Sequence, residues 1–555
     1  MTTVLTASAQ GGAGLALVMG FGLLCIRQTS AASILLAIQS VAVALAAVAM
    51  HQPIMAVPPV ILATGIWFAR LRTTMLKTWT MPAGGAKLGV GAGAVLAVLC
   101  QSQGSLAMPL AVVLLSVLLA ATRTHPLMRV MALVAVQNGI LLAACLVIQP
   151  AFLPPWLLPL ACLVLPLPLA AFLLIPAVPS RGIRGRPWLG WIDLSLSLAV
   201  LAATFIAPLD PLASVFAPLL GLDGVLRSEV RRRRQGVATP SIGATSPPSL
   251  PGQEGGVGLA PPSTRFAHTI AGRGLALLNS VVLVLAVCAP NPMMAWLALP
   301  AAVATALLPT RGRHWDQAVL ASLGTAMVLF GLMLISATPS VVGYFSLFAG
   351  FAAIATVVPD LAVVSVILIL RLATLAPWPP VAEALGVGIA LAALLGCAFM
   401  LIREGLMRDR ATLLLLCQAS IAALSICMGG TDGRFAALVL LILIILSRSA
   451  ARLRHGPIAG LALAGLGGVP PLGVFPGLVL VVLAMSRHDP WLLLPVVLAA
   501  IPVLLAAVPR RLPDTWSIAA IRSIVWVPLV LAVLVGYFVP DGLSHWWHFI
   551  TAGRS

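Results

Sequence analysis

Runs of about twenty apolar residues recur from one end of this chain to the other, which is the length that a helix needs to cross a bilayer. Lipid offers no partner to the backbone of an open sheet, so such runs must fold as helices. Hydrophobic residues make up 61% of the 555 residues and charged residues only 8%, which excludes a soluble globular protein. The sequence therefore predicts an all-α, polytopic integral membrane protein.

Charged or Pro/Gly-rich breaks divide the chain into about 20 expected transmembrane helices. They cover residues 11–26, 31–50, 54–69, 88–103, 106–122, 130–148, 155–176, 188–207, 211–226, 274–289, 291–309, 317–336, 341–358, 361–377, 382–402, 411–429, 435–447, 457–485, 490–508 and 523–539. Basic residues accumulate in cytoplasmic loops. Nearly all basic loops fall on one side of this arrangement, and Arg434, Arg487 and Arg554 are the exceptions. We therefore expect both termini to be extracytoplasmic, and the net charge of +18 to reflect topology without a nucleic-acid partner.

Residues 227–273 differ in composition from the rest of the chain. They are rich in Pro, Gly and Ser and lack apolar periodicity, which is typical of a flexible cytoplasmic linker. The segment opens with the densest basic patch, Arg231–Arg234, which is of the kind that attracts anionic headgroups. We place the main domain boundary earlier, near Ser180.

The sequence contains no motif of a soluble-type catalytic centre, such as a Walker loop, a dinucleotide fingerprint, a nucleophile elbow or HExxH. The eight cysteines fall in apolar runs without a CxxC pair, so we interpret them as packing residues. His545 and His548 flank two tryptophans near a terminus, where an interfacial anchor is favoured over metal ligation. We expect no catalytic residue, no metal and no cofactor on this chain.

The first part of the chain has no acidic residue between Met1 and Trp191. Proton or cation relays in membranes usually use buried ionisable groups, so carboxylates cannot serve as a relay here. The most polar groups in these expected helices are the amides of Gln39, Gln137 and Asn138. Hydrogen bonds between helices, worth about 0.6–2 kcal/mol each, are the favoured role, and a polar path is the alternative.

Two stretches around these amides resemble a known family. IQSVAVALAAVAM and MRVMALVAVQNGILLAA are similar to component E of hydrogenase-4, a relative of the small K-type subunit of respiratory complex I. The family reads roughly CQSLVLVS and MENG at these positions. Gln39 keeps the family's glutamine, and Gln137 stands where the family has a glutamate. Over residues 10–178 the resemblance implies a seven-helix unit in which an ionisable group has become a neutral amide.

The stretch GLGGVPPLGVFPGL, residues 465–478, places glycine and proline inside the expected span 457–485. Non-helical backbone at membrane depth is tolerated only where it is buried in protein or lines a cavity. The stretch resembles the discontinuous twelfth helix, close to GLPPxxGFxxK, of the antiporter-like subunits of complex I, hydrogenase-4-type complexes and multisubunit sodium/proton antiporters. The resemblance assigns the broken-helix segment to Gly467, Gly468, Pro470, Pro471 and Gly473.

The charged positions of that family are apolar in this chain. Leu478 stands where the family has the lysine of the broken twelfth helix, and Leu297 in PMMAWLALP where it has a glutamate. GFAAIATVVP keeps the spacing of the family's broken seventh helix, GFxxKxxxxP, and ends at Pro359, but Ile354 replaces its lysine. Over residues 188–540 the resemblance implies an antiporter-like unit whose channel has lost its charges.

Other charges lie at or near the ends of expected helices, where snorkelling or interfacial solvation accounts for them. They are Asp193, Asp210, Asp223, Asp360, Arg371 and Glu383. An ion pair of Arg371 with Asp360 or Glu383 is an alternative, and an ion path through these residues is another.

Together the resemblances imply a natural fusion of a component E-like unit, residues 1–180, with a degenerate antiporter-like unit, residues 181–555. Such a chain would be a non-catalytic membrane scaffold or coupling element of a respiratory, hydrogenase or formate-hydrogenlyase-like complex in a bacterial-type inner membrane. Its partners would be lipid and the other membrane and peripheral subunits, which carry the redox centres. The alternative is a stand-alone secondary transporter, or a cation/proton antiporter component, that uses the broken helices.

Overall fold

The described part of the chain is entirely helical in its regular elements. The computed structural model describes residues 2–26, 29–72, 91, 93–98, 100, 104, 106–123, 126–147, 162, 187–206, 210–236, 278–289, 292–307, 315–337, 340–375, 377–403, 410–451, 457–470, 472–507, 526–538, 543–545 and 547–548. Among these residues, 7 helices are long and apolar enough to cross a membrane, and shorter apolar helices accompany them. The predicted class, an all-α membrane protein, is confirmed.

Five helices form the N-terminal part of the bundle. They are α1 (Thr2–Cys25), α2 (Thr29–Ala49), α3 (Pro53–Arg72), α5 (Ala107–Thr122) and α6 (Pro126–Val147). Helix α2 packs against α1, α3 and α6, and α5 packs against α1 and α6. The crossing of α1 and α2 is close at Gly12, where a Cβ would lie 2.9 Å from the carbonyl oxygen of Ala42. Small residues at such crossings let helix backbones approach within a membrane.

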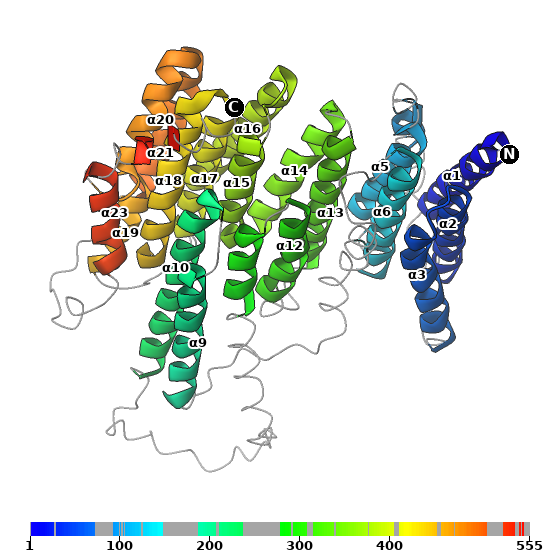
Figure 1. The fold of residues 1–555 in the computed structure, drawn as a ribbon, viewed down its shortest axis with the longest axis horizontal. Helices are drawn as coiled ribbons and strands as arrows, with labels where there is room; N and C mark the ends of the chain where they lie inside the picture. Colours follow the sequence, from blue (N-terminus) through cyan, green and yellow to red (C-terminus); the bar gives the residue numbers. More distant parts are fainter. Residues whose placement is uncertain are drawn as a thin grey trace, which may run out of the picture.

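The remaining described helices build the larger, C-terminal part. They are α9 (Pro187–Ile206), α10 (Pro211–Gly236), α12 (Pro292–Leu307), α13 (Trp315–Ala337), α14 (Val341–Val357), α15 (Pro359–Leu375), α16 (Pro380–Arg403), α17 (Arg410–Cys427), α18 (Gly430–Ala451), α19 (Pro457–Leu466), α20 (Phe475–His488), the short 3-10 helix η3 (Pro490–Leu492), α21 (Leu493–Ala507) and α23 (Trp526–Phe538). Figure 1 shows the helices as an elongated array, with α1–α3 at one end and α19–α23 at the other.

The two parts are joined by α6 and α13, which pack against each other. Arg129 on α6 forms an ion pair with Asp316 on α13. The expected boundary near Ser180 lies outside the described residues, as does the expected span 155–176 apart from Cys162.

Outer helices of the C-terminal part present large apolar side chains to the surroundings. Phe399 and Ile402 on α16 are 61% and 68% exposed, and Leu505 on α21 is 73% exposed. In contrast, the stretch from Ala436 to Leu446 of α18 is buried throughout. Exposed apolar faces of this size fit contact with lipid, so α18 forms the interior of the bundle and α16 and α21 its outer layer.

Helix α10 continues to Gly236, so the expected linker does not begin at Arg227. Arg227 Nε donates a hydrogen bond of 2.8 Å to Asp223 Oδ2 one turn earlier, and such pairs favour continuation of a helix. The rest of the expected linker lies outside the described residues.

Pro359 is the first residue of α15, and α14 ends at Val357. A proline at this position costs no hydrogen bond, since the first turn of a helix leaves its N–H groups unpaired. Helices α14 and α15 pack against each other. The structure thus places Pro359 at the boundary between two helices, in agreement with the expected spans 341–358 and 361–377.

We predict that Gly331→Ala destabilises the protein by about 1–3 kcal/mol, because overpacking forces α13 and α14 apart. A Cβ on Gly331 would lie 2.6 Å from the carbonyl oxygen of Gly343 and from the backbone nitrogen of Leu347. The measurement is thermal unfolding in detergent micelles. Gly396→Ala on α16 is the matched control, since a Cβ there meets nothing within 4 Å. Equal melting temperatures for the two variants would contradict the close packing.

Candidate functional site

The chain leaves helical geometry between α19 and α20. Gly468 has φ 80° and Gly473 has φ 53°, which glycine adopts without strain. A Cβ on Gly473 would collide with the backbone of Gly465, so the chain can fold back on itself only because this residue has no side chain. The N–H of Val474 then donates to the carbonyl oxygen of Gly465 at 3.0 Å. The non-helical segment is therefore a compact, internally bonded turn.

The end of α19 has the bonding of a Schellman cap. The N–H of Val469 donates to the carbonyl of Ala464 at 3.0 Å, and the N–H of Gly468 donates to the carbonyl of Gly465 at 3.2 Å. Gly467 lies against α21, where a Cβ would collide with Ala507. Pro470 is exposed, and Pro471 lies outside the described residues.

Leu478 lies in the first turn of α20 and covers this non-helical segment. Its Cδ1 lies 2.5 Å from the position that a Cβ on Gly468 would take. The side chain is half-buried and packs against the apolar core. The position that carries a lysine in the resembled family is thus occupied by an apolar group that closes over the glycine.

Gln418 on α17 is the polar group beside the same turn. Its Nε2 lies 3.9 Å from the position of a Cβ on Gly468. The side chain is fully buried, and neither amide atom has a hydrogen-bond partner among the described residues. Gln418 was not among the residues predicted from the sequence, although LLLLCQASIAAL shows the same signal as the segments around Gln39 and Gln137: one amide in an apolar helix.

Ile354 and Leu297, the other two positions at which the resembled family has a charge, are also enclosed by apolar packing. Ile354 on α14 is 0% exposed, and its Cγ1 lies 2.9 Å from the position of a Cβ on Gly324 of α13. Leu297 on α12 is half-buried against the core. The neighbouring Trp296 is fully buried and donates from Nε1 to the carbonyl of Thr325 at 2.7 Å. Neither position offers a titratable group.

A cluster of four charged residues connects α10, α15 and α18. The Asp223 carboxylate accepts hydrogen bonds from Arg227 and from Arg448. Arg227 Nη1 donates to Asp360 Oδ2 at 3.0 Å, and Arg448 Nη1 donates to the carbonyl oxygen of Asp360 at 3.3 Å. Asp223 is 1% exposed and Arg448 2%. We call these four residues the buried ion cluster; its two aspartates balance its two arginines.

A second ion pair connects the other ends of α10 and α15. Arg371 pairs with Asp210 and also donates to the carbonyl of Val287 at 3.1 Å. The expected alternative pairing of Arg371 with Asp360 does not form, because the two residues lie 11 positions apart on α15, about 16 Å along its axis. Asp210 takes the place of Asp360 as the partner of Arg371.

Arg371 and Asp223 were expected to be solvated at the membrane interface, but both are buried, with exposed fractions of 5% and 1%. Asp210 and Asp223 are 13 residues apart, about 20 Å along α10. Both sets of ion pairs thus fit within the roughly 30 Å hydrocarbon thickness. Asp193 falls in α9, and its side chain is not among those described.

Glu383, the third residue of the expected ion pair, lies away from both sets. It is half-buried in the first turn of α16, and its Oε1 lies 2.8 Å from the position of a Cβ on Gly429. Its carboxylate interacts electrostatically with Arg434 on α18. Glu383 therefore belongs to the surroundings of the turn between α17 and α18.

The N-terminal amides form a hydrogen-bonded cluster between α1, α2 and α6. Gln39 Nε2 donates to the carbonyl of Ala16 at 3.0 Å, and Asn138 Nδ2 donates to Ser40 Oγ at 2.9 Å. Asn138 Nδ2 also lies 3.5 Å from Gln39 Oε1. Gln137 is equally buried, but neither of its amide atoms has a partner among the described residues. The structure thus brings Gln39 and Asn138 together and leaves Gln137 apart.

Within the described ranges, no group of three or more His, Cys, Asp or Glu could hold a metal ion. All eight cysteines are free thiols. No protein-family model, curated protein or solved structure matches the chain. The interpretation of the site therefore depends on the geometry of this chain.

We predict that Asp223→Asn destabilises the protein by about 3–5 kcal/mol, because two buried arginines lose their shared counter-charge. Unfolding in detergent micelles measures the change. Asp432→Asn is the matched control: it breaks the exposed Asp432–Arg487 pair, whose atoms are 3.2 Å apart. We expect at most about 1 kcal/mol there. A smaller loss for Asp223→Asn than for Asp432→Asn would show that the cluster does not hold the helices.

A second prediction compares two adjacent buried amides. Asn138→Leu removes the bond to Ser40, so we expect a loss of about 1–3 kcal/mol. Gln137→Leu removes an amide without a partner and should be nearly neutral. The same unfolding measurement applies to both variants. A greater loss for Gln137→Leu would indicate a polar contact of Gln137 that holds the helices.

Proposed function

We propose that this chain is a non-catalytic, membrane-embedded subunit of a respiratory, hydrogenase or formate-hydrogenlyase-like complex. In this proposal it crosses a bacterial-type inner membrane about 20 times and serves as a scaffold or coupling element with an impaired proton channel. Residues 1–180 form the component E-like unit and residues 181–555 the antiporter-like unit. The redox centres and cofactors belong to other subunits.

The observation that carries the proposal is the geometry around Gly468. A non-helical turn within a membrane helix suits an ion or substrate path, because it exposes backbone groups that can coordinate. Here backbone N–H groups of the turn donate hydrogen bonds to carbonyl groups at the end of α19, and the side chain of Leu478 covers the turn. Ile354 is likewise sealed against α13. A proton relay needs a titratable group, and these positions have none. The interrupted helix is present, but it lacks the titratable group that proton transport requires. This combination supports a structural role.

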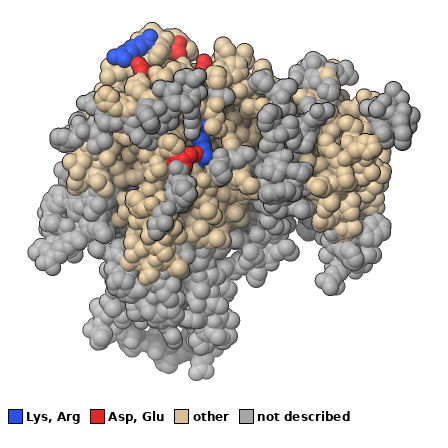
Figure 2. Space-filling view, viewed as in Figure 1, with Lys and Arg blue, Asp and Glu red and all other residues tan. Residues whose placement is uncertain are grey.

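The placement of the charges supports the same role. The strongly buried carboxylate of Asp223 is shared by two arginines, and Arg371 is held by Asp210. Groups fixed in ion pairs are poor proton carriers, since a change of protonation would leave an uncompensated buried charge. Figure 2 shows few charged side chains on the visible face of the described residues. Such a surface fits lipid and apolar neighbouring subunits.

The experiment is purification of the tagged chain from native membranes in mild detergent, with mass spectrometry of the proteins that co-purify. We expect further antiporter-like membrane subunits and a peripheral arm that carries iron–sulfur or other metal centres. An unrelated membrane protein with the same tag is the control. Purification of the chain alone would overturn the proposal.

A stand-alone transporter, or a cation/proton antiporter component, is the second candidate, and the unpaired amide of Gln418 beside the turn favours it. A pH-sensitive dye inside liposomes that contain the purified chain distinguishes the two functions. The scaffold role predicts no proton movement above that of protein-free liposomes, with or without a sodium gradient. Proton movement that Gln418→Leu abolishes would establish the transporter.

A further inference from the structure

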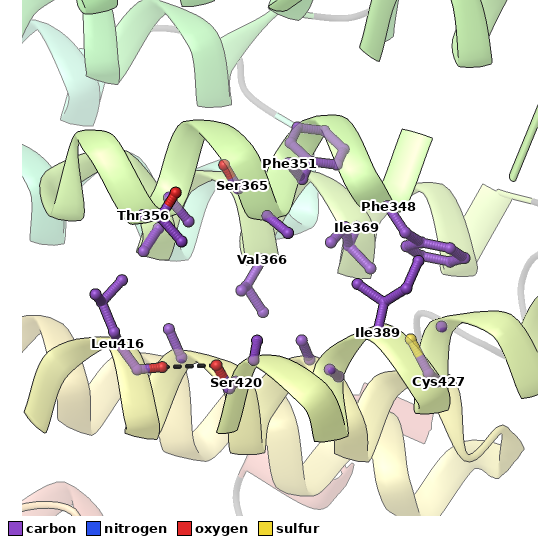
Figure 3. Close-up of a pocket in the computed structure, with 18 of the residues that line it drawn as sticks. Phe348, Phe351, Thr356, Ser365, Val366, Ile369, Ile389, Leu416, Ser420 and Cys427 are labelled. Carbon is purple, nitrogen blue, oxygen red and sulfur yellow. Dashed lines mark hydrogen bonds between the residues drawn. The ribbon is translucent and has the colours of Figure 1, made fainter. Parts of the chain in front are cut away.

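An apolar cavity lies between α14, α15, α16 and α17 (Figure 3). The cavity volume is about 70 Å³, within a hollow of about 600 Å³ that includes space open to the surroundings. Small side chains make up much of its wall, including Ala352, Ala355, Ala390, Ala393, Ala419 and Ala423. An apolar occupant that packs against this wall gains dispersion contacts with it.

The cavity is elongated along the helix axes. Its wall on α14 extends from Phe348 to Thr356, about 12 Å, and its wall on α17 extends from Leu416 to Cys427, about 16 Å. Because these helices cross the membrane, the long axis of the cavity is parallel to the acyl chains of the surrounding lipid. The direction and the lining of the cavity both suit a hydrocarbon chain.

The two ends of the cavity differ. At one end Phe348 and Cys427 are 4% and 1% exposed, so this end is closed. At the other end Thr356 is exposed, so this end opens to the surroundings. Ser365 and Ser420 line the half nearer Thr356, as Figure 3 shows. The inner half of the cavity is therefore apolar, and its outer half carries hydroxyl groups.

Ser365 lacks the hydrogen bond that its neighbours have. Ser420 Oγ donates to the carbonyl of Leu416 at 2.8 Å. Ser365 is 2% exposed, and its hydroxyl has no partner among the described residues. Because buried polar groups are normally hydrogen-bonded, this hydroxyl indicates an acceptor supplied from within the cavity.

Basic residues lie beyond the open end. Arg403 is the last residue of α16, six positions beyond the lining residue Cys397, and Arg410 is the first residue of α17, six positions before Leu416. Each is thus about 9 Å beyond the wall along its helix. Basic side chains at a membrane surface attract anionic headgroups. The sequence of features from inside to outside is apolar, hydroxyl-bearing and cationic, which is the order of the parts of a phospholipid.

We propose that this cavity binds one acyl chain of an anionic phospholipid from the surrounding bilayer. The ester carbonyl accepts a hydrogen bond from Ser365, the part of the acyl chain next to the ester extends toward Phe348 and Cys427, and the phosphate lies near Arg403 and Arg410. The site does not depend on the proposed role of the chain in a complex.

Native mass spectrometry of the purified full chain tests the proposal with equal amounts of dioleoyl phosphatidylglycerol and dioleoyl phosphatidylcholine. We expect one retained phosphatidylglycerol per chain. Ala393→Leu fills the cavity and should lower retention at least about tenfold. Ala392→Leu is the matched control, since Ala392 is exposed on α16 and does not line the cavity, and it should retain the lipid.

Two further variants separate the parts of the site. Arg403→Gln should abolish the preference for phosphatidylglycerol over phosphatidylcholine and leave total lipid retention unchanged. Ser365→Ala adds no volume, so it keeps the fold and should weaken retention even if Ala393→Leu does not fold. The proposal is overturned if Ser365→Ala retains the lipid as the wild type does, if a folded Ala393→Leu retains it, or if the wild type binds both lipids equally.

Discussion

The shared carboxylate of Asp223 is the interaction on which the C-terminal part of the structure depends. It binds Arg227 within α10 and Arg448 on α18, and both arginines also contact Asp360 at the start of α15. Desolvation makes each of these charges expensive on its own, so the three helices hold their positions only while the cluster is complete. The apolar packing of α18 and the cavity beside α15 therefore depend on the buried ion cluster.

The buried ion pairs among the described residues hold helices together. Asp210 with Arg371 and the buried ion cluster connect α10 to α15 at two levels about 16–20 Å apart. Ile354 on the neighbouring α14 is fully buried against Gly324 of α13. Leu478 performs the same apolar closure at the interrupted helix.

The sequence predicted those features that local chemistry determines. Apolar runs of bilayer length are sufficient for membrane helices, and the glycines of residues 465–478 indicated the interruption because a positive φ favours glycine. The partner of Arg371 could not be predicted, since Asp210 lies 161 residues away and nothing near either residue encodes their contact. Gln418 was as visible as Gln39, but only the tertiary packing shows that its amide has no partner among the described residues. The extension of α10 past Arg227 was not predicted, because the Pro, Gly and Ser content of residues 227–273 indicated a linker. The i,i+4 pair of Asp223 and Arg227, which favours a helix, was given less weight.

The two ion pairs of α10 can form at different times during synthesis of the protein. Asp223 and Arg227 neutralise each other one turn apart, so this pair can enter the bilayer without net charge. Asp210 has no such local counter-ion and must await Arg371, which is 161 residues later. At ribosomal elongation rates that interval is on the order of ten to thirty seconds. The ion pair between α10 and α15 at this level can therefore form only after α15 has been made.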